Sequence, residues 1–285
     1  MDRSGEEASG TQALDRAVGL LRLVASATGR GARLADLIEQ SNFSKPTGHR
    51  LLRALERLGL LEQDPATRLY HLGPEAFVVG ALAAERFGVH RAALPSLARI
   101  ASASEDTAFL SVRRDWHAVC LHREEGPFPI RSHVLKAGDR HPLGVGAGSL
   151  AILAALPDAE AEAMIQASAG EIATRYPDFS PALLRDLAVQ TRARGFALNP
   201  GLLMAGSWGI GVPVLDRQGR CEGALSIAAI ESRLGTSRQQ ELAVLLKAEA
   251  QRLAESLAKP AGASDLSPPA PRRRSAAAGA SHNRR

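Results

Sequence analysis

Residues 34–60, LADLIEQSNFSKPTGHRLLRALERLGL, constrain the fold more than any other segment of this 285-residue chain. Apolar residues at helical spacing flank a cluster of turn formers, which predicts a short helix, a tight turn and a second helix. Ser44 is expected to cap the second helix by accepting an amide hydrogen bond, and Pro46 suits its first turn. Such a helix-turn-helix can place its second helix in the major groove of DNA.

The second helix is expected to carry an apolar face and a basic face. Leu51, Leu55 and Leu58 predict the buried stripe. Base edges are expected to meet the start of the helix, and phosphates its later arginines. The residues concerned are Ser44, Lys45, Thr47, Gly48, His49 and Arg50 for the groove, and Arg53 and Arg57 for phosphates. The alternative is that these arginines form only a solvated helix face.

A β-hairpin is expected directly after this helix, in the position of a wing. Residues 60–62 and 68–72 have the pattern of short strands around the turn sequence 64–67. Arg68 would lie at the hairpin tip, where it could contact a phosphate or the minor groove. A preceding helix is predicted by Leu14, Val18, Leu21 and Ala25.

Composition and length bound the remaining possibilities. A chain of 285 residues with 45% hydrophobic residues favours two packed domains. No apolar run reaches the length of a membrane span and no signal region begins the chain, so we expect a cytoplasmic protein without a membrane partner. The two cysteines, Cys120 and Cys221, predict neither a disulfide framework nor a zinc motif.

The net charge of +5 is not by itself a sign of nucleic-acid binding. Five arginines lie at 272–274 and 284–285, and the remaining 30 Lys and Arg residues balance the 30 Asp and Glu residues. The tail is rich in Pro, Ala, Ser and Gly and is expected to be disordered. It either adds nonspecific attraction to phosphates or has no role in binding.

The pattern along the chain predicts an α+β fold around an antiparallel sheet. Alternation predicts strands at 107–113, 118–124 and 131–136, and a hairpin from 209–215 and 221–230. Helices are expected at 93–104, 149–156, 158–168, 181–195 and 236–259. The predicted organisation is a disordered N-terminus at 1–10, a winged helix-turn-helix domain at 11–74, a linker helix at 75–92, a second domain at 93–259 and a disordered basic tail at 260–285.

Three glycines, Gly144, Gly146 and Gly148, precede the helix predicted at 149–156. Free amides at a helix start favour an anion, so a ligand carboxylate could bind there. A flexible turn is the alternative, and a dinucleotide site is disfavoured because the segment lacks the GxGxxG spacing.

Two enzyme-like patterns are disfavoured. His117 should point away from Cys120 and His122 on an alternating strand, which leaves too few ligands for a metal ion. No GxSxG motif surrounds any serine, and residues 139–141 are expected to form a surface turn. We therefore expect no catalytic residues, no metal and no cofactor.

The chain resembles the IclR family of bacterial transcription regulators over roughly residues 11–258. The resemblance is carried by FSKPTGHRLLRALERLGLL, YHLG, HPLGVGAGSLAILAAL and RGFALNPGLLMAGSWGIGVPVLDRQGRCEGALSIAAIESRL, in this order. It implies a winged helix-turn-helix, a linker helix and a GAF-like effector-binding domain at 93–259. It also implies a homodimer through the DNA-binding modules, commonly paired into a homotetramer, that controls a catabolic operon, more often by repression than by activation.

The family pattern implies an effector pocket for a small carboxylate. Together with the glycine-rich helix start, it assigns Gly146, Ala147, Gly148, Asn199, Trp208, Gly209, Ser226 and Ala228 to this pocket. The chain departs from the family at 200–203, where acidic residues are frequent, and at Ala228, where a hydroxyl sometimes occurs. These apolar replacements predict a larger or more apolar ligand, such as an aromatic acid. The alternative for Trp208 is a place in the core.

Two function classes remain from the sequence. The first is a regulator that binds double-stranded operator DNA and responds to a small acid. The second is a GAF-like thiol redox enzyme using Cys120 and Cys221, which would need an exposed thiolate with a lowered pKa. Cys120 lies in an apolar strand pattern, whereas Cys221 follows a turn where exposure is expected.

Overall fold

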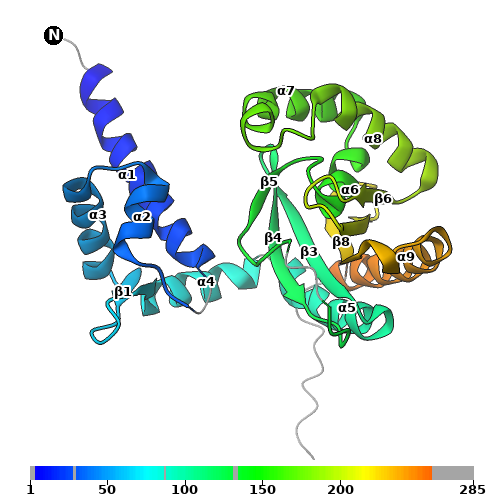
Figure 1. Cartoon of the computed structure of the whole chain (residues 1–285), viewed down its shortest axis with the longest axis horizontal. Helices are drawn as coiled ribbons and strands as arrows, with labels where there is room; N and C mark the ends of the chain where they lie inside the picture. Colours follow the sequence, from blue (N-terminus) through cyan, green and yellow to red (C-terminus); the bar gives the residue numbers. More distant parts are fainter. Residues whose placement is uncertain (1–3, 28–29, 87, 131–133, 259–285) are drawn as a thin grey trace, which may run out of the picture.

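The computed structural model describes residues 4–27, 30–86, 88–130 and 134–258. It shows an N-terminal helical module and a larger α+β domain, which α4 (Pro74–Arg86) connects (Figure 1). The tail from residue 260, expected to be disordered, lies outside the described residues. The expectation of a loose segment at 1–10 was wrong for most of its length, because α1 (Ser4–Ser26) begins at Ser4.

The N-terminal module consists of α1, α2 (Leu34–Ser41), α3 (Lys45–Arg57) and a hairpin of β1 (Leu61–Gln63) and β2 (Tyr70–Leu72). The helix-turn-helix and the wing therefore lie where the sequence predicted them. One apolar core joins all of these elements. Its fully buried members include Leu20 of α1, Leu37 of α2, Leu52 of α3 and Tyr70 of β2.

The predicted buried stripe of α3 was right at Leu55 and wrong at Leu58, and α1 packs through positions beside some of those that predicted it. In α3 the buried residues are Gly48, Leu52 and Leu55, whereas Leu58 is 61% exposed. In α1 the inner positions are Leu20 and Val24, whereas Leu14 and Val18 are exposed. Leucines at adjacent positions in both helices allow more than one stripe, and packing against neighbouring elements decides between them.

The C-terminal domain contains a six-stranded antiparallel sheet in the order β5-β4-β3-β8-β7-β6. The long strands β3 (Thr107–Arg114), β4 (His117–Glu124), β7 (Ser207–Leu215) and β8 (Cys221–Ile230) agree with the predicted ones. The edges differ, because β5 is Arg140–Pro142 and β6 (Ala197–Pro200) was not predicted. Residues 134–136 of the strand predicted at 131–136 belong to no strand, and the remainder of it lies outside the described residues.

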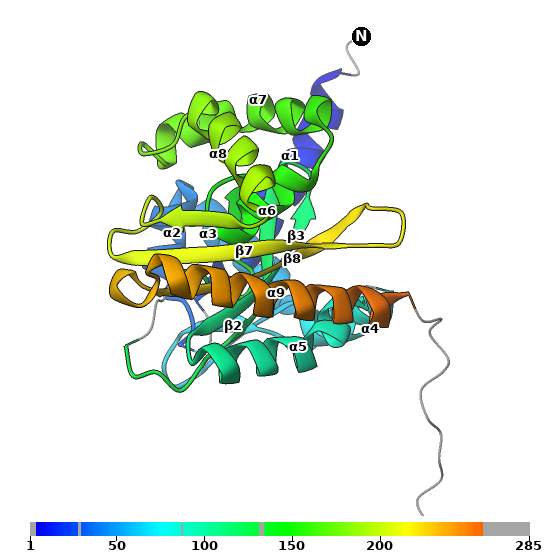
Figure 2. The same cartoon turned by 90° about the vertical axis from the view of Figure 1, so that its right-hand side faces the viewer.

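Helices cover both faces of this sheet (Figure 2). On one face lie α6 (Ala147–Ala155), α7 (Asp158–Arg175) and α8 (Pro181–Arg194), and on the other α5 (Val89–Ser104) and α9 (Thr236–Leu257). Each face has its own apolar core. Among the described residues, no helix combines the length and the apolar composition needed to cross a bilayer.

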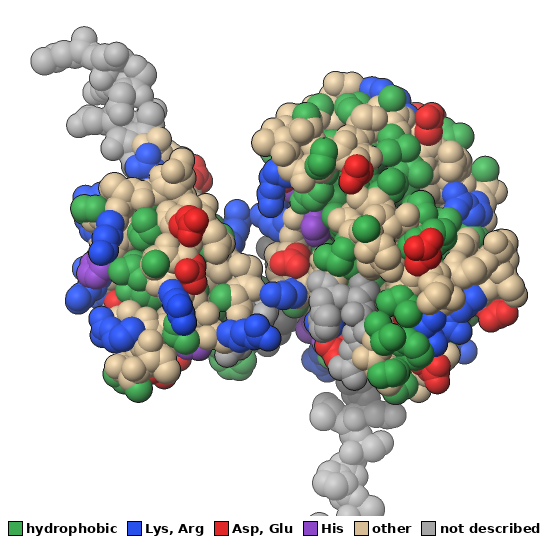
Figure 3. Space-filling view, in the orientation of Figure 1, with side chains coloured by type: hydrophobic (Ala, Val, Ile, Leu, Met, Phe, Trp, Pro, Cys, Tyr) green, Lys and Arg blue, Asp and Glu red, His purple; other side chains and the backbone are tan. Residues whose placement is uncertain are grey.

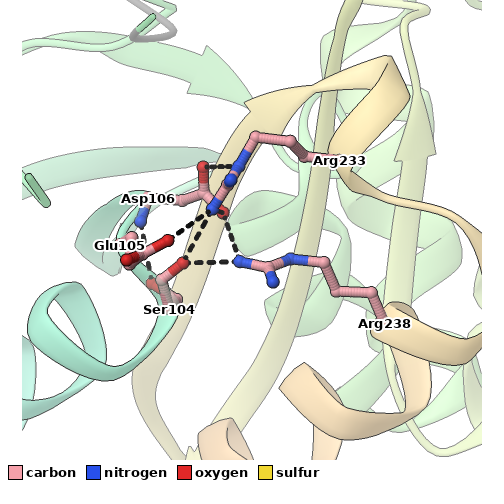
Figure 4. A network of polar contacts seen from close by, with 5 residues as sticks. All are labelled: Ser104, Glu105, Asp106, Arg233 and Arg238. Atoms are coloured by element: carbon pink, nitrogen blue, oxygen red, sulfur yellow. Dashed lines mark hydrogen bonds and ion pairs between the residues drawn. The ribbon is translucent and has the colours of Figure 1, made fainter. Parts of the chain in front are cut away.

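A cluster of polar contacts joins the end of α5 to the segments that follow β8 (Figure 4). Asp106, which is 2% exposed, directly precedes β3 and lies between two arginines. Arg233 comes from the short 3-10 helix η1 (Glu231–Arg233), and Arg238 from the first turn of α9. Both arginines also donate to the Ser104 carbonyl, so the helix end and the carboxylate share the same two cations.

Candidate DNA-binding surface and ligand cavity

The exposed face of α3 carries cations that have no carboxylate partner. Lys45, Arg50, Arg53 and Arg57 are exposed, and within the described part of the chain none of them forms an ion pair. Figure 3 shows Lys and Arg side chains along the outer edge of the N-terminal module, over α3. In the C-terminal domain, by contrast, many arginines are paired, among them Arg99 with Glu249. Unpaired cations on an exposed helix are available to phosphates.

The start of α3 differs from the prediction at two positions. Ser44 is the N-cap residue, but its hydroxyl donates to Thr47 Oγ1 at 2.9 Å and accepts no amide hydrogen bond. Gly48 is buried against α2, where a Cβ atom would lie 2.0 Å from Ile38 Cδ1. The expectation that Gly48 lies on the exposed face was therefore wrong. Thr47 and His49 are half-buried and flank it at the helix start.

The tip of the hairpin between β1 and β2 is held by side-chain hydrogen bonds. Asp64 Oδ1 accepts from the amides of Ala66 and Thr67, at 2.8 and 2.7 Å, and these bonds lower the pKa of its carboxyl group. Arg68 follows with a φ of 62°, and its side chain is exposed. The structure thus places Arg68 at the tip of the wing, as predicted.

A cavity in the C-terminal domain lies between the sheet and the start of α6. It contains about 380 Å³ of empty space, a volume that includes open solvent, and the centre of a water molecule can occupy about 40 Å³ of it. All eight residues assigned to a pocket from the sequence line it: Gly146, Ala147, Gly148, Asn199, Trp208, Gly209, Ser226 and Ala228. The structure therefore brings together segments that are up to 82 residues apart in the chain.

Strand register explains why these residues meet. Asn199 of β6, Gly209 of β7 and Ala228 of β8 are successive neighbours across the sheet. Ser226 lies in the next row, opposite Phe109 of β3. Side chains two residues apart on a strand share a face, so both rows face α6.

Two glycines of β7 allow α6 to begin directly on the sheet. A Cβ atom at Gly211 would lie 2.8 Å from the Ala147 carbonyl oxygen, and one at Gly209 would lie 3.1 Å from the Ala147 Cβ. The helix begins at Ala147 with Gly146 as its N-cap, two residues earlier than predicted. Gly148 is consequently inside the first turn. Helix amides without intrahelical acceptors therefore border the cavity.

Two buried polar side chains supply further donors to the cavity. Ser226 is 4% exposed, and its Oγ lies 2.9 Å from where a Cβ atom would stand on Gly148. Asn199 is 5% exposed, and its Oδ1 accepts from the Leu202 amide at 3.0 Å. Together with the helix amides, these groups can bind an anionic oxygen atom.

The sequence analysis missed some of the other residues of the cavity wall. Phe109 faces the cavity from β3, and Leu203 comes from the loop before β7. The Gly-x-Gly pattern at 209–211 was the available signal for the position of the cavity, because glycines within a strand mark a place where another segment lies close to the sheet. Leu203 and Ser207 belong to the segment 199–211, which was expected to supply one wall of the pocket. The missed lining residues are Phe109, Val134, Leu135 and Ile227.

Trp208 combines the two roles that the sequence left open. It is partly buried and packs against the core shared by α5 and α9. It also borders the cavity, and its indole nitrogen would lie 3.6 Å from a Cβ atom on Gly201. The residue therefore belongs to the core and touches the loop beside the cavity.

The cysteines do not have the environment of redox-active thiols. Burial raises the pKa of Cys120 to about 12, and burial also raises the pKa of Cys221 to about 11. Cys221 is half-buried, whereas exposure was expected. Since the thiolate is the reactive species, both residues are poorly suited to redox catalysis at neutral pH.

The histidines of β4 lie on opposite faces of the sheet. His117 contacts Glu171 of α7, whereas His122 contacts His90 of α5. In the described ranges no group of three or more metal-ligating residues occurs. Residues 140–142 form an edge strand, and His141 contacts Tyr176, so the surface turn expected at 139–141 was wrong.

Family comparisons agree with this arrangement. The IclR helix-turn-helix domain matches residues 13–65, and the bacterial transcriptional regulator IclR C-terminal domain matches residues 81–255. The glycerol operon regulatory protein of Streptomyces griseus is 32% identical over 226 residues, which is 78% of this chain and 86% of that protein.

Solved structures show the same fold. An IclR transcriptional regulator from Alicyclobacillus acidocaldarius has a TM-score of 0.70 at 25% identity and covers 86% of this chain and 98% of its own. An IclR homologue from Microbacterium hydrocarbonoxydans, complexed with 4-hydroxybenzoate, has a TM-score of 0.68 at 20% identity, with the same coverage. Members of this family are DNA-binding transcription regulators and not enzymes. The chain therefore belongs to the IclR family of bacterial transcription regulators.

Proposed function

We propose that this regulator is a repressor of a catabolic operon and that a small organic acid releases it from its operator. The observation that carries the proposal is the separation of two sites in one chain. An unpaired basic face lies on α3, and a partly open cavity with hydrogen-bond donors lies in the other domain. A ligand can shift DNA affinity only through a different affinity for the two states of the protein.

In this proposal α3 enters the major groove and the hairpin of β1 and β2 contacts the backbone. Arg50 lies in the first half of α3, where such helices read base edges. Arg53, Arg57 and Arg68 contact phosphates, which position the protein without reading sequence. Ser44, Lys45, Thr47 and His49 complete the reading surface, and Gly48 supports it from inside.

The proposed ligand is an aromatic or similarly apolar acid. Its carboxylate binds at the start of α6 and at Ser226, and its apolar part contacts Phe109 and Leu203. The structure of the Microbacterium homologue with 4-hydroxybenzoate demonstrates that the fold can hold an acid of this class.

We further propose a homodimer that forms through the N-terminal half of the chain. The connecting helix α4 exposes Phe77, Val78, Val79 and Leu82, at 77, 45, 53 and 66% respectively. Leu14 of α1 is also 67% exposed. An apolar helix exposed on several faces requires a partner, and a two-fold operator requires two recognition helices. Sedimentation of Phe77→Ser should show monomers where the wild-type chain forms dimers.

The decisive experiment is a screen of DNA fragments from around the protein's own gene by fluorescence anisotropy, with bulk competitor present. One fragment should bind selectively, and footprinting should show two half-sites about one helical turn apart or a multiple of this spacing. Aromatic acids should then weaken the complex. If no fragment binds better than the competitor, the proposal is wrong.

A further inference from the structure

We propose that Asn199 selects ligands that carry a hydrogen-bond acceptor opposite the acid group, namely para-oxygenated aromatic carboxylates. The inference rests on the function proposed above and specifies the ligand of the same cavity. It follows from three features of the described residues: the orientation of one buried amide, its distance from Ser226 and the apolar wall between them.

The orientation of the Asn199 amide is determined by its neighbour. Its side chain accepts from the Leu202 amide, and only an oxygen atom can do so, which assigns that atom as Oδ1. The Nδ2 group has no acceptor among the described residues. It is also absent from the fully buried side-chain atoms that lack a partner, so it keeps some contact with solvent. Because Asn199 is 95% buried and lines the cavity, its free N–H groups are accessible from the cavity.

The backbones of the two donor residues lie far enough apart to leave room for one substituted aromatic ring between their side chains. Asn199 and Ser226 are two strands apart across the sheet and two residues apart along it. This separation is roughly 12 Å between the two backbones, and both side chains extend into the same cavity. A carboxylate at Ser226 and Gly148 therefore places a para substituent toward Asn199.

The wall between the two donors is apolar, and its floor carries only small side chains. Gly209 and Ala228 form the floor of the row that ends at Asn199, and neither has a side chain larger than a methyl group. Phe109 and Leu203 lie beside it. A buried N–H group left without an acceptor costs free energy, so a ligand with an oxygen at this position binds better than an apolar isostere.

The test compares two acids of the same shape, 4-methoxybenzoate and 4-ethylbenzoate, by calorimetry on the full chain. The wild-type protein should prefer the methoxy acid by roughly three- to tenfold, the value of one neutral hydrogen bond. In Asn199→Asp the carboxylate still accepts from Leu202 but repels the ether oxygen. The preference should therefore disappear or reverse, while both acids bind more weakly.

Two further variants test whether the ratio of the two acid affinities depends specifically on Asn199. Gln218→Glu introduces the same amide-to-acid change at an exposed turn and should leave the ratio unchanged. Ser226→Ala should weaken both acids by the same factor. Trp208 fluorescence in a Trp116→Phe background gives an independent signal, since the chain contains two tryptophans and Trp208 borders the cavity.

Three results would overturn the inference. The wild-type protein could bind the two acids equally well, the affinity ratio could be unchanged in Asn199→Asp, or neither acid could bind at millimolar concentration. Operator binding is measured separately on the same protein. If the operator is bound and the acids show no preference, only this inference fails. If the acids show the expected ratio and no operator is found, the proposed function fails instead.

Discussion

Asp106 Oδ1 lies 2.9 Å from the Nε of Arg233, a contact that joins the residue before β3 to the turn after β8 (Figure 4). The same carboxylate contacts Arg238 of α9 at 2.9 Å. The Arg233 guanidinium also stacks 3.7 Å from the centre of the Phe128 ring, on the segment that leads toward Val134 at the cavity. One buried acid therefore ties the end of α5, the sheet and α9 together.

Removal of the Asp106 charge should lower the free energy of unfolding. Asp106→Asn leaves two arginines without a buried counter-charge, and we expect a loss of about 3 kcal/mol in the free energy of unfolding. Asp158→Asn is the matched control, because Asp158 pairs with Arg192 at a side chain that is 90% exposed, and it should cost less than about 1 kcal/mol. Urea denaturation measures both values. Equal effects would show that burial of the Asp106 pair does not matter.

The arginines of α3 should differ in what they contribute to DNA binding. Arg50→Ala should weaken operator binding by roughly 1–3 kcal/mol and relax the sequence preference, since it removes a base contact. Arg57→Ala should weaken operator and nonspecific DNA alike and reduce the salt dependence by about one counterion. Anisotropy titrations at several salt concentrations give both quantities. Similar behaviour of the two variants would contradict the assignment of base and phosphate contacts.

The effect of Gly48→Ala on stability should change sign when Ile38 is shortened. Gly48→Ala places its methyl group against Ile38 Cδ1 and should destabilise the chain by about 1–2 kcal/mol. In an Ile38→Val background the blocking methyl group is absent, so the same change should be neutral or stabilising by up to about 1 kcal/mol, the helix preference of Ala over Gly. Thermal denaturation of the four proteins completes the cycle. An equal cost in both backgrounds would rule out this contact as the cause.

The two thiols should react slowly and only at high pH. Burial raises the pKa of both groups, to about 12 for Cys120 and about 11 for Cys221, so the thiolate fraction is very small at pH 8 and grows as the pH rises. Alkylation by iodoacetamide in the native chain should therefore be far slower than that of free cysteine at pH 8. A rapid reaction of Cys221 at pH 7 would revive the redox alternative.

The long elements and the candidate sites were predictable because local patterns specify them. Alternation along 107–113 and 221–230 marks strands with one face on each core, and the turn residues at 41–44 interrupt helical spacing. The family resemblance then assigned eight residues that the structure places around one cavity. These features could be predicted because each depends on residues close together in the chain or on an ordered set of motifs.

Tertiary packing decided the features for which the local sequence pattern allows more than one arrangement. Either Leu51 or Leu52 could face inward by spacing alone, and contact with α1 and α2 selects Leu52. The edge strands β5 and β6 are three and four residues long, so their conformation depends on pairing with β4 and β7 rather than on their own propensity. The Phe109 and Leu203 side chains line the cavity because strand register and loop closure place them beside α6, and neither is encoded by neighbouring residues.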